Sequence, residues 1–82
     1  MIKIGKTEKK IILLLISKKG LRTVDVSRMT GNSYYYISQL ISGLVYRGIV
    51  QELFVANDGK YYGVNNKLED ELLKELGGDK NG

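Results

Sequence analysis

The first strongly hydrophobic segment of the chain is a run of six residues, Ile11 to Ile16, with basic and polar residues on both sides. On a helix of about 3.6 residues per turn, such a run covers almost the whole circumference. It predicts a helix over residues 7–19, with Thr7 as the N-cap and Gly20 as the C-terminal stop. Because this helix is apolar nearly all round, we expect it to be covered on two sides, by its own core and by another surface.

Two further helices with a tight turn between them are predicted next. Thr23 is the expected N-cap of a short helix that runs to Thr30. Gly31 breaks this helix, and Asn32 and Ser33 both offer an N-cap for a longer helix that ends at about Arg47. The apolar positions of the longer helix fit a period of about 3.6 residues: Ile37, Leu40, Ile41, Leu44 and Val45.

A β-hairpin is predicted after the third helix. Residues 49–55 and 61–64 are rich in β-branched and aromatic side chains. Asp58-Gly59 lies between these two runs, and this dipeptide is a strong hairpin signal. Because an isolated two-stranded hairpin is only marginally stable, we expect it to pack on the helices.

A last helix is predicted near the end of the chain. Asn66 and Glu69 have the spacing of a capping box for a helix over residues 67–76. Leucine recurs along one side of this helix, which is the pattern of an amphipathic segment. We expect residues 1–76 to form a single domain and residues 77–82, rich in glycine, to be a disordered tail.

The order and spacing of these elements match those of a known family. Residues 23–33 are similar to its second helix and turn, and residues 47–50 to the exit from its third helix. Its recognition helix and its returning strand are matched by Ile37, Ile41, Leu44, Tyr62 and Val64. Asn32 departs from the pattern, because the family usually has an aliphatic residue there. Residues 8–64 thus resemble the winged helix-turn-helix DNA-binding domains of small bacterial, archaeal and viral transcriptional regulators.

The resemblance implies a fold class and a function. The fold would be α+β but mostly α, with a three-helix helix-turn-helix core, a two-stranded β-hairpin wing and a C-terminal helix. The function would be sequence-specific binding of double-stranded DNA by a transcriptional regulator, with the third helix in the major groove. Repression by occlusion of a promoter is the simplest mechanism, and no small-molecule effector is implied.

Charge and composition agree with this function and exclude others. The net charge of +4 is the sum of +7 over residues 1–50 and −3 over residues 51–82, an asymmetry that favours binding of a polyanion by one face. The 82 residues include no Cys and no His, which removes disulfides, thiolate metal sites and the commonest general base. We therefore expect no catalysis, no metal and no cofactor.

The outward side of the third helix carries polar groups without charge. With Ile37 at the centre of the buried side, steps of about 100° place Ser, Tyr and Gln opposite it. Gln can bond bidentately to adenine, while Tyr and Ser hydroxyls can reach bases or phosphates, and flanking basic residues would hold the backbone. The alternative is that the tyrosines, Tyr36 above all, are packing groups. The expected DNA-binding residues are Ser33, Tyr34, Tyr35, Ser38, Gln39, Ser42, Arg22, Arg28, Arg47 and Lys60.

The last helix is expected to support dimerisation. A ten-residue helix cannot bury its own leucines alone, and the first helix has spare apolar surface. We expect the two to meet across a two-fold axis, which would suit a pseudo-palindromic DNA site. The alternative is that the last helix covers its own monomer. The expected interface residues are Ile11, Leu14, Leu68, Leu72 and Leu76.

A second functional class stays open from sequence alone. Tyrosine is enriched at protein interfaces, so the tyrosine-rich side of the third helix would also suit a protein-interaction module. A membrane protein is not expected, because the longest apolar run is far shorter than the ~20 residues of a membrane span. The chain is therefore predicted to be intracellular, cytoplasmic or nucleoid-associated.

Overall fold

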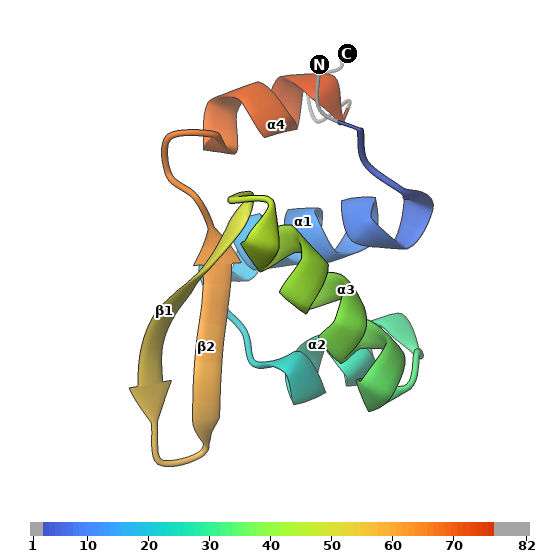
Figure 1. The fold of residues 1–82 in the computed structure, drawn as a ribbon, viewed down its shortest axis with the longest axis vertical. Coiled ribbons are helices and arrows are strands. Elements are labelled where there is room, and N and C mark those ends of the chain that lie inside the picture. The colour runs from blue at the N-terminus through green and yellow to red at the C-terminus, as the bar shows by residue number, and fades with distance from the viewer. Residues whose placement is uncertain (1–2, 77–82) are drawn as a thin grey trace.

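The computed structural model describes residues 3–76, which form four helices and one two-stranded antiparallel sheet (Figure 1). Their order is the predicted one, and the fold class is confirmed. The predicted tail, residues 77–82, lies outside the described residues. The elements are α1 (Lys6–Lys18), α2 (Thr23–Thr30), α3 (Tyr34–Tyr46), β1 (Val50–Ala56), β2 (Gly59–Val64) and α4 (Glu69–Glu75).

The first helix is shifted slightly from its predicted bounds. Gly5 rather than Thr7 is the N-cap of α1, and its N–H donates to the Glu8 carboxylate at 2.7 Å. At the other end, Lys19 adopts the left-handed conformation at φ 59° and stops the helix one residue before Gly20. The Lys19 N–H then donates to a carbonyl of the last turn, as expected at a helix C-terminus.

The turn between α2 and α3 follows the prediction closely. Gly31 has φ 73° and ends α2, since glycine takes this left-handed conformation without steric cost. The Ser33 hydroxyl accepts from the N–H of Tyr36 at 3.1 Å and so caps α3. The Ser27 hydroxyl donates to the Asn32 carbonyl at 2.6 Å, which holds the turn where the aliphatic residue of the family is missing.

The hairpin of β1 and β2, called the wing below, is joined by a two-residue turn of Asn57 and Asp58, the wing turn. Both strands differ by one or two residues from the predicted runs. An irregularity in register lies between Glu52 and Phe54. Next to it, the Leu53 side chain folds over Gly63, where an added Cβ would lie 2.7 Å from its Cδ1.

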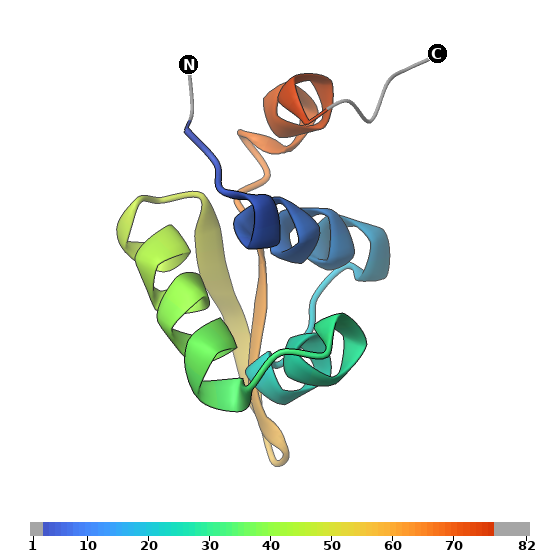
Figure 2. The same ribbon diagram turned by 90° about the vertical axis from the view of Figure 1, so that its right-hand side faces the viewer.

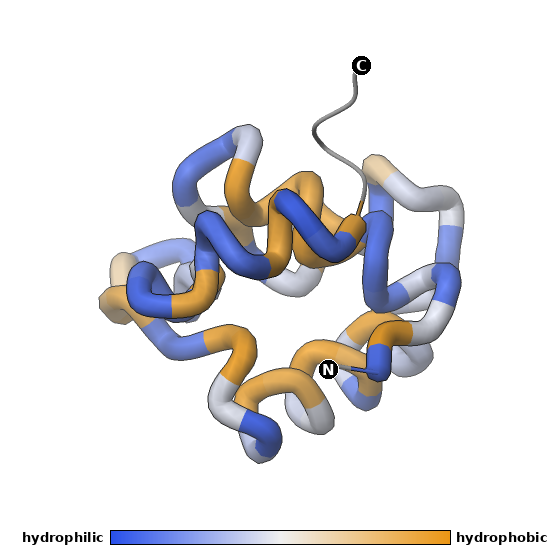
Figure 3. The backbone as a smooth tube through the Cα atoms, turned by 90° about the horizontal axis from the view of Figure 1, so that it is seen from above, coloured by the Kyte–Doolittle hydropathy of each residue, from blue (hydrophilic) through white to orange (hydrophobic). Residues whose placement is uncertain are grey.

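The core lies where the three N-terminal helices meet the base of the wing. Helices α1 and α3 pack against β2 and β1 respectively, and α2 packs against α3. Val45 is exposed although its position fits the apolar pattern of α3. Figure 3 views the molecule from the α4 end and shows hydrophobic stretches of the helices between hydrophilic ones. The buried side chains are Ile11, Ile12, Leu15, Val26, Ile37, Ile41, Leu44, Ile49, Val50, Val64 and Leu72.

The last helix is shorter than predicted and starts later. It begins at Glu69 after Leu68, so Asn66 is not its N-cap; instead the Asn65 side-chain oxygen accepts from the Lys67 N–H at 3.0 Å. Figures 1 and 2 both show α4 above α1, at the opposite end of the molecule from the wing turn. In this position Leu72 is completely buried.

The burial of these side chains corrects two of the interface predictions. Ile11 and Leu72 are fully enclosed within the chain itself, so neither is available to a partner in this conformation. Leu68 and Leu76 are partly buried and pack against the same core. Leu68, Leu72 and Leu76 thus pack on the core of their own chain, which was the alternative interpretation. Leu14 alone of the five predicted residues is partly exposed without packing against this core cluster.

Candidate nucleic-acid interface

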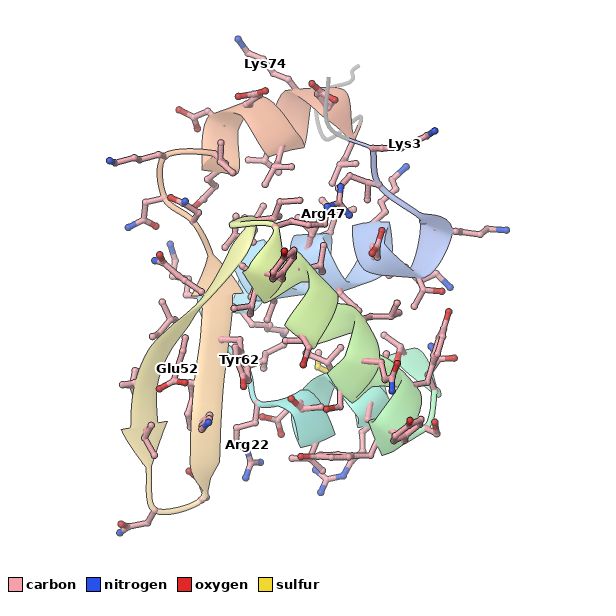
Figure 4. All side chains as sticks on the ribbon, viewed as in Figure 1. Lys3, Arg22, Arg47, Glu52, Tyr62 and Lys74 are labelled. Atoms are coloured by element: carbon pink, nitrogen blue, oxygen red, sulfur yellow. The ribbon has the colours of Figure 1, made fainter. Side chains whose placement is uncertain are left out.

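Three segments share one end of the molecule: the start of α2, the first half of α3 and the wing turn (Figure 1). Helix α4 occupies the opposite end of the long axis, which extends for 38 Å. Figure 4 shows Arg22 at the same end of the molecule as the wing turn, whereas Lys3, Arg47 and Lys74 lie toward the opposite end. A binding surface built on α3 and the wing therefore draws on a limited set of side chains.

The outward side of α3 is open and carries no charged group in the helix itself. Tyr35 is 73% exposed and Tyr34 58%, while Ser33, Gln39 and Ser42 are also exposed. Ser38 is partly buried, so it lies at the edge of this surface. The result is a surface of hydroxyl and amide groups in a helix that can enter a major groove.

Two further tyrosines of α3 are exposed. Tyr36, which the alternative interpretation made a packing group, is 45% exposed, and Tyr46 at the far end of the helix is 92% exposed. Periodicity placed Tyr36 at the edge beside α2 and Tyr46 on the outward side. The exposed aromatic surface of α3 therefore includes Tyr36 in addition to the tyrosines expected there.

One hydrogen bond orders the outward side of α3. The Gln39 Nε2 donates to the Tyr35 hydroxyl at 2.7 Å, across one helical turn. The amide oxygen of Gln39 and the second hydrogen of its Nε2 take no part in this bond. Gln39 is therefore oriented by Tyr35 while it keeps the acceptor and donor that bidentate bonding to adenine requires.

Arg22, predicted to hold a phosphate, is engaged within the protein. Its Nε and Nη2 donate to the two carboxylate oxygens of Asp25 at 2.9 and 2.7 Å. Its Nη1 donates to the Asp58 carbonyl at 3.2 Å and lies 3.3 Å from the Asp58 carboxylate. These bonds raise the pKa of Arg22 above its ordinary value and lower that of Asp25, the hydrogen bond between the two side chains being the main cause. The prediction of a free phosphate contact is not supported.

Arg47 is also engaged, and on another side of the molecule. Its guanidinium donates to the carbonyl of Lys3, and its Nη1 lies 3.7 Å from a carboxylate oxygen of Glu8. Figure 4 shows the guanidinium beside the segment before α1, away from the start of α3. Arg47 joins the end of α3 to the beginning of α1, so its predicted place among the phosphate contacts is not supported either.

Arg28 and Lys60 keep more of their charge available. Arg28 is exposed on α2 and forms no ion pair with any residue between 3 and 76. Lys60 is exposed on β2 beside the wing turn, with its Nζ 3.8 Å from a carboxylate oxygen of Glu52. At that distance on a surface, the pair contributes little and can open when a phosphate competes.

A hollow lies between the wing, the start of α2 and the start of α3. Its lining includes the cations Arg22 and Lys60, the Asp58 carboxylate and the Tyr34 ring. Two contacts of Asp58 had no signal in the sequence. The Tyr61 hydroxyl donates to the Asp58 carboxylate at 3.0 Å, and this bond raises the pKa of Tyr61. Asp58 also bonds to Arg22, 36 positions away, whereas the sequence marked Asp58 only as a turn residue.

The described part of the chain gives no sign of a metal site or a membrane segment. Among residues 3–76, no group of three or more His, Cys, Asp or Glu side chains could hold a metal ion. None of the helices within these residues is long and apolar enough to cross a bilayer.

The sequence matches no protein-family model and no curated protein. The fold, in contrast, matches solved structures of transcription regulators. The adhesin competence repressor AdcR of Streptococcus pyogenes is 19% identical with a TM-score of 0.77, over 90% of this chain and 55% of its own. NadR, solved with 4-hydroxyphenylacetate, is 21% identical with a TM-score of 0.78, over 92% of this chain and 54% of its own.

A mutant form of ZitR from Lactococcus lactis shares the fold at 12% identity and a TM-score of 0.78, over 90% of this chain and 51% of its own. This chain therefore spans about half the length of these regulators. At such identities the likeness concerns the fold alone. It confirms that the chain has a winged helix-turn-helix fold.

Proposed function

We propose that this chain binds double-stranded DNA in a sequence-specific way and regulates transcription, with α3 as the helix that reads the major groove. The observation that carries the proposal is the open, uncharged and hydrogen-bonding side of α3 next to the wing turn. A helix of this kind fits the major groove, where side-chain amides and hydroxyls distinguish base pairs. The likeness of the fold to repressors such as AdcR supports the same class of function.

In the proposed complex, contacts divide between bases and backbone. Gln39, held by Tyr35, faces the edge of an adenine, and Ser42 and Tyr35 lie beside it on the same side of α3. Arg28 on α2 and Lys60 on the wing supply charge for phosphates, which fixes the register of the protein on the duplex. We assign Arg22 and Arg47 no direct contact with DNA, because Asp25 and Asp58 engage the Arg22 guanidinium and Arg47 bonds to Lys3, away from the start of α3.

Repression is proposed to follow from occupancy of a promoter. A bound domain excludes other proteins from the same stretch of DNA, and this needs no conformational switch. The 4-hydroxyphenylacetate in the NadR structure belongs to NadR. For this chain, the same compound added at millimolar concentration should leave the thermal midpoint unchanged; an increase in that midpoint would show binding to the folded state.

We also propose that the active form is a homodimer, through a surface that keeps only Leu14 of the five predicted interface residues. Leu13 and Leu14 of α1 and Met29 of α2 lie in a shallow hollow whose lining also includes Lys10, Ser17 and Thr30. Burial of this hollow against its copy would exclude water from exposed apolar side chains. Two α3 helices spaced by about one DNA turn, ~34 Å, would then meet a pseudo-palindromic site.

Sedimentation tests the dimer. At tens of micromolar, the wild-type protein should have twice the monomer mass, and Leu14→Glu should return it to the monomer. Lys74→Glu on α4 is a matched control that changes charge away from the hollow and should leave the dimer intact. A monomeric wild type would contradict the dimer without contradicting DNA binding by one domain.

The decisive experiment for function is selection of bound sequences from random duplex DNA at two salt concentrations. We expect one enriched symmetric motif, with affinity that falls by orders of magnitude between about 50 and 200 mM salt because phosphate contacts release counterions. No enrichment at either concentration would contradict the proposal. An asymmetric motif would support DNA reading but contradict the dimer.

A protein-interaction module is the second candidate function. It is favoured by the exposure of four tyrosines on one helix, including Tyr46 at 92%, and by the engagement of Arg22 and Arg47 in ion pairs. Tyrosine-driven contacts depend on burial rather than on counterion release, so a partner bound this way should show little change in affinity between about 50 and 200 mM salt.

A further inference from the structure

The wing is attached to α2 through one side chain. Arg22, the residue before α2, bonds bidentately to Asp25 in the first turn of that helix. The same guanidinium reaches both the carbonyl and the carboxylate of Asp58 in the wing turn, at 3.2 and 3.3 Å. A single planar group thus bonds to two elements that are 36 positions apart in the sequence. We call the set of Arg22, Asp25, Asp58 and Tyr61 the Arg22 clamp.

Other contacts of the wing converge on this clamp. The Tyr61 hydroxyl donates to Asp58, and the Tyr61 ring stacks on Phe54 with centroids 4.7 Å apart. The Arg22 Cζ lies over the Tyr61 ring, 5.9 Å from its centroid. Directly before Arg22, Leu21 and Tyr62 exchange backbone hydrogen bonds of 3.0 and 2.8 Å. The backbone bonds of Leu21 and the Arg22 clamp therefore both attach the wing to the segment that precedes α2.

The clamp decides between two roles for Arg22. In a bidentate phosphate contact, two N–H groups of the guanidinium would point outward to the DNA. Here the Nε and Nη2 groups of Arg22 donate to Asp25, and Nη1 donates to Asp58. Its charge also offsets two carboxylates that would otherwise repel DNA at this end of the molecule. Release of Arg22 would uncover both carboxylates and free the wing turn at once.

We propose that Arg22 is a positioning residue, which fixes the wing turn against α2 so that the wing and α3 form one rigid binding surface. The attachment itself is a property of the free protein. Its effect on DNA affinity rests on the proposed function. The two parts are tested by different measurements.

Amide hydrogen exchange of the free protein tests the attachment. In Arg22→Gln, the amides of Leu21 and Tyr62 should exchange at least about fivefold faster, because local opening of the wing becomes easier. The amide of Ile41 in the core of α3 should be unaffected. Arg28→Gln removes an equal charge from α2 without touching the clamp, and should leave all three rates unchanged.

Asp58→Ala is a second variant, which removes a negative charge near the DNA where Arg22→Gln removes a positive one. Loss of a negative charge near DNA would by itself strengthen binding. Loss of the carboxylate that pairs with Arg22 and accepts from Tyr61, with the backbone carbonyl bond retained, should instead speed exchange at Tyr62 and weaken binding. This variant also serves if Arg22→Gln does not fold. Unchanged exchange at Tyr62 in Asp58→Ala would overturn the proposal.

The salt dependence of DNA binding separates the two roles of Arg22. The plot of log K against log salt has a negative slope. Loss of one phosphate contact makes this slope less steep, by about 0.9 in magnitude. For a positioning residue, Arg22→Gln should weaken binding about tenfold or less with no such change in slope, and Arg28→Gln should show the change. A less steep slope in Arg22→Gln with unchanged exchange would overturn the proposal. If the wild-type protein binds no DNA but the exchange rates change as stated, the proposed function fails and the attachment stands.

Discussion

Helices α3 and α4 both have one apolar side, yet the molecule uses them in different ways. In α3, 13 residues long, Ile37, Ile41 and Leu44 enter the core and the opposite side is left open. In α4, seven residues long, Leu72 is completely buried, whereas Asp70, Glu71 and Glu75 are exposed. The short helix closes the core, while the long one both completes the core and presents a surface.

The difference follows from length and position. A helix as short as α4 has little stability of its own, so its apolar side chains must pack on the rest of the chain to keep it folded. Helix α3 packs on its inner side against α1, α2 and β1, which leaves its outer side exposed. An open polar side on a well-supported helix is therefore better evidence of a binding site than an apolar stripe at the end of a chain.

The largest expected effect concerns the buried side of α4. Leu72→Ala should lower the free energy of unfolding by about 2–5 kcal/mol, because a cavity replaces a fully buried side chain. Urea denaturation measures this change. Glu71→Ala on the exposed side is the control, with an expected change within about 0.5 kcal/mol. An unchanged stability together with a halved mass would show that α4 serves an interface after all.

The next effect concerns the open side of α3. Gln39→Ala should weaken binding to the selected DNA site by about 1–3 kcal/mol, because a bidentate base contact is lost, with stability unchanged. Gln51→Ala on the exposed part of β1 is the matched control and should bind as the wild type does. Fluorescence anisotropy on the selected site and on a scrambled one measures both. Equal losses on the two sequences would mean that Gln39 does not read bases.

A smaller effect is expected at the start of α3. Ser33→Ala removes the acceptor for the Tyr36 N–H and should cost about 1 kcal/mol of stability. Ser42→Ala, exposed further along the same helix, lacks that role and should cost much less. Thermal unfolding of the three proteins measures the difference. Similar losses in both variants would show that Ser33 does not cap the helix.

The smallest effect is the dependence of stability on acid. Arg22 holds the pKa of Asp25 below the ordinary value of 3.8, mainly through its side-chain hydrogen bond. A carboxyl whose pKa is lower in the folded state stabilises the fold above the unfolded pKa, and this contribution disappears as the pH falls through the folded value. Urea midpoints should therefore fall less steeply below pH 3.8 in Asp25→Asn than in the wild type.

Local signals made most of the fold predictable. Gly31 and Ser33 mark the turn between α2 and α3, and Asp58-Gly59 marks the hairpin, because each residue acts on its own backbone. Periodicity placed Ile37, Ile41 and Leu44 on the buried side of α3 and Tyr35, Gln39 and Ser42 on the open side, as the structure has them, but it misplaced Val45, which is exposed, and Ser38, which is partly buried. The bounds of α4 were wrong, because a side chain of Asn65 rather than Asn66 bonds to the turn that precedes it.

The state of the arginines could not be predicted in the same way. Arg22 and Arg28 look alike in sequence, as cations near the same helix, but one is clamped by two carboxylates and the other is exposed. The partner of Arg22 in the wing turn and the partner of Arg47 before α1 are 36 and 44 positions away. Such pairings depend on how distant segments meet in space, which residue type and charge do not reveal.

The bond of Arg47 to Lys3 has a practical consequence for labelling. It fastens the beginning of the described chain to the far end of α3, on the side of the molecule away from Arg22 and the wing turn. A fluorescent protein or affinity tag joined ahead of Lys3 would leave from that side. Such fusions should leave the outward side of α3 unobstructed, so that a fluorescent label there can be used to count molecules on single DNA fragments.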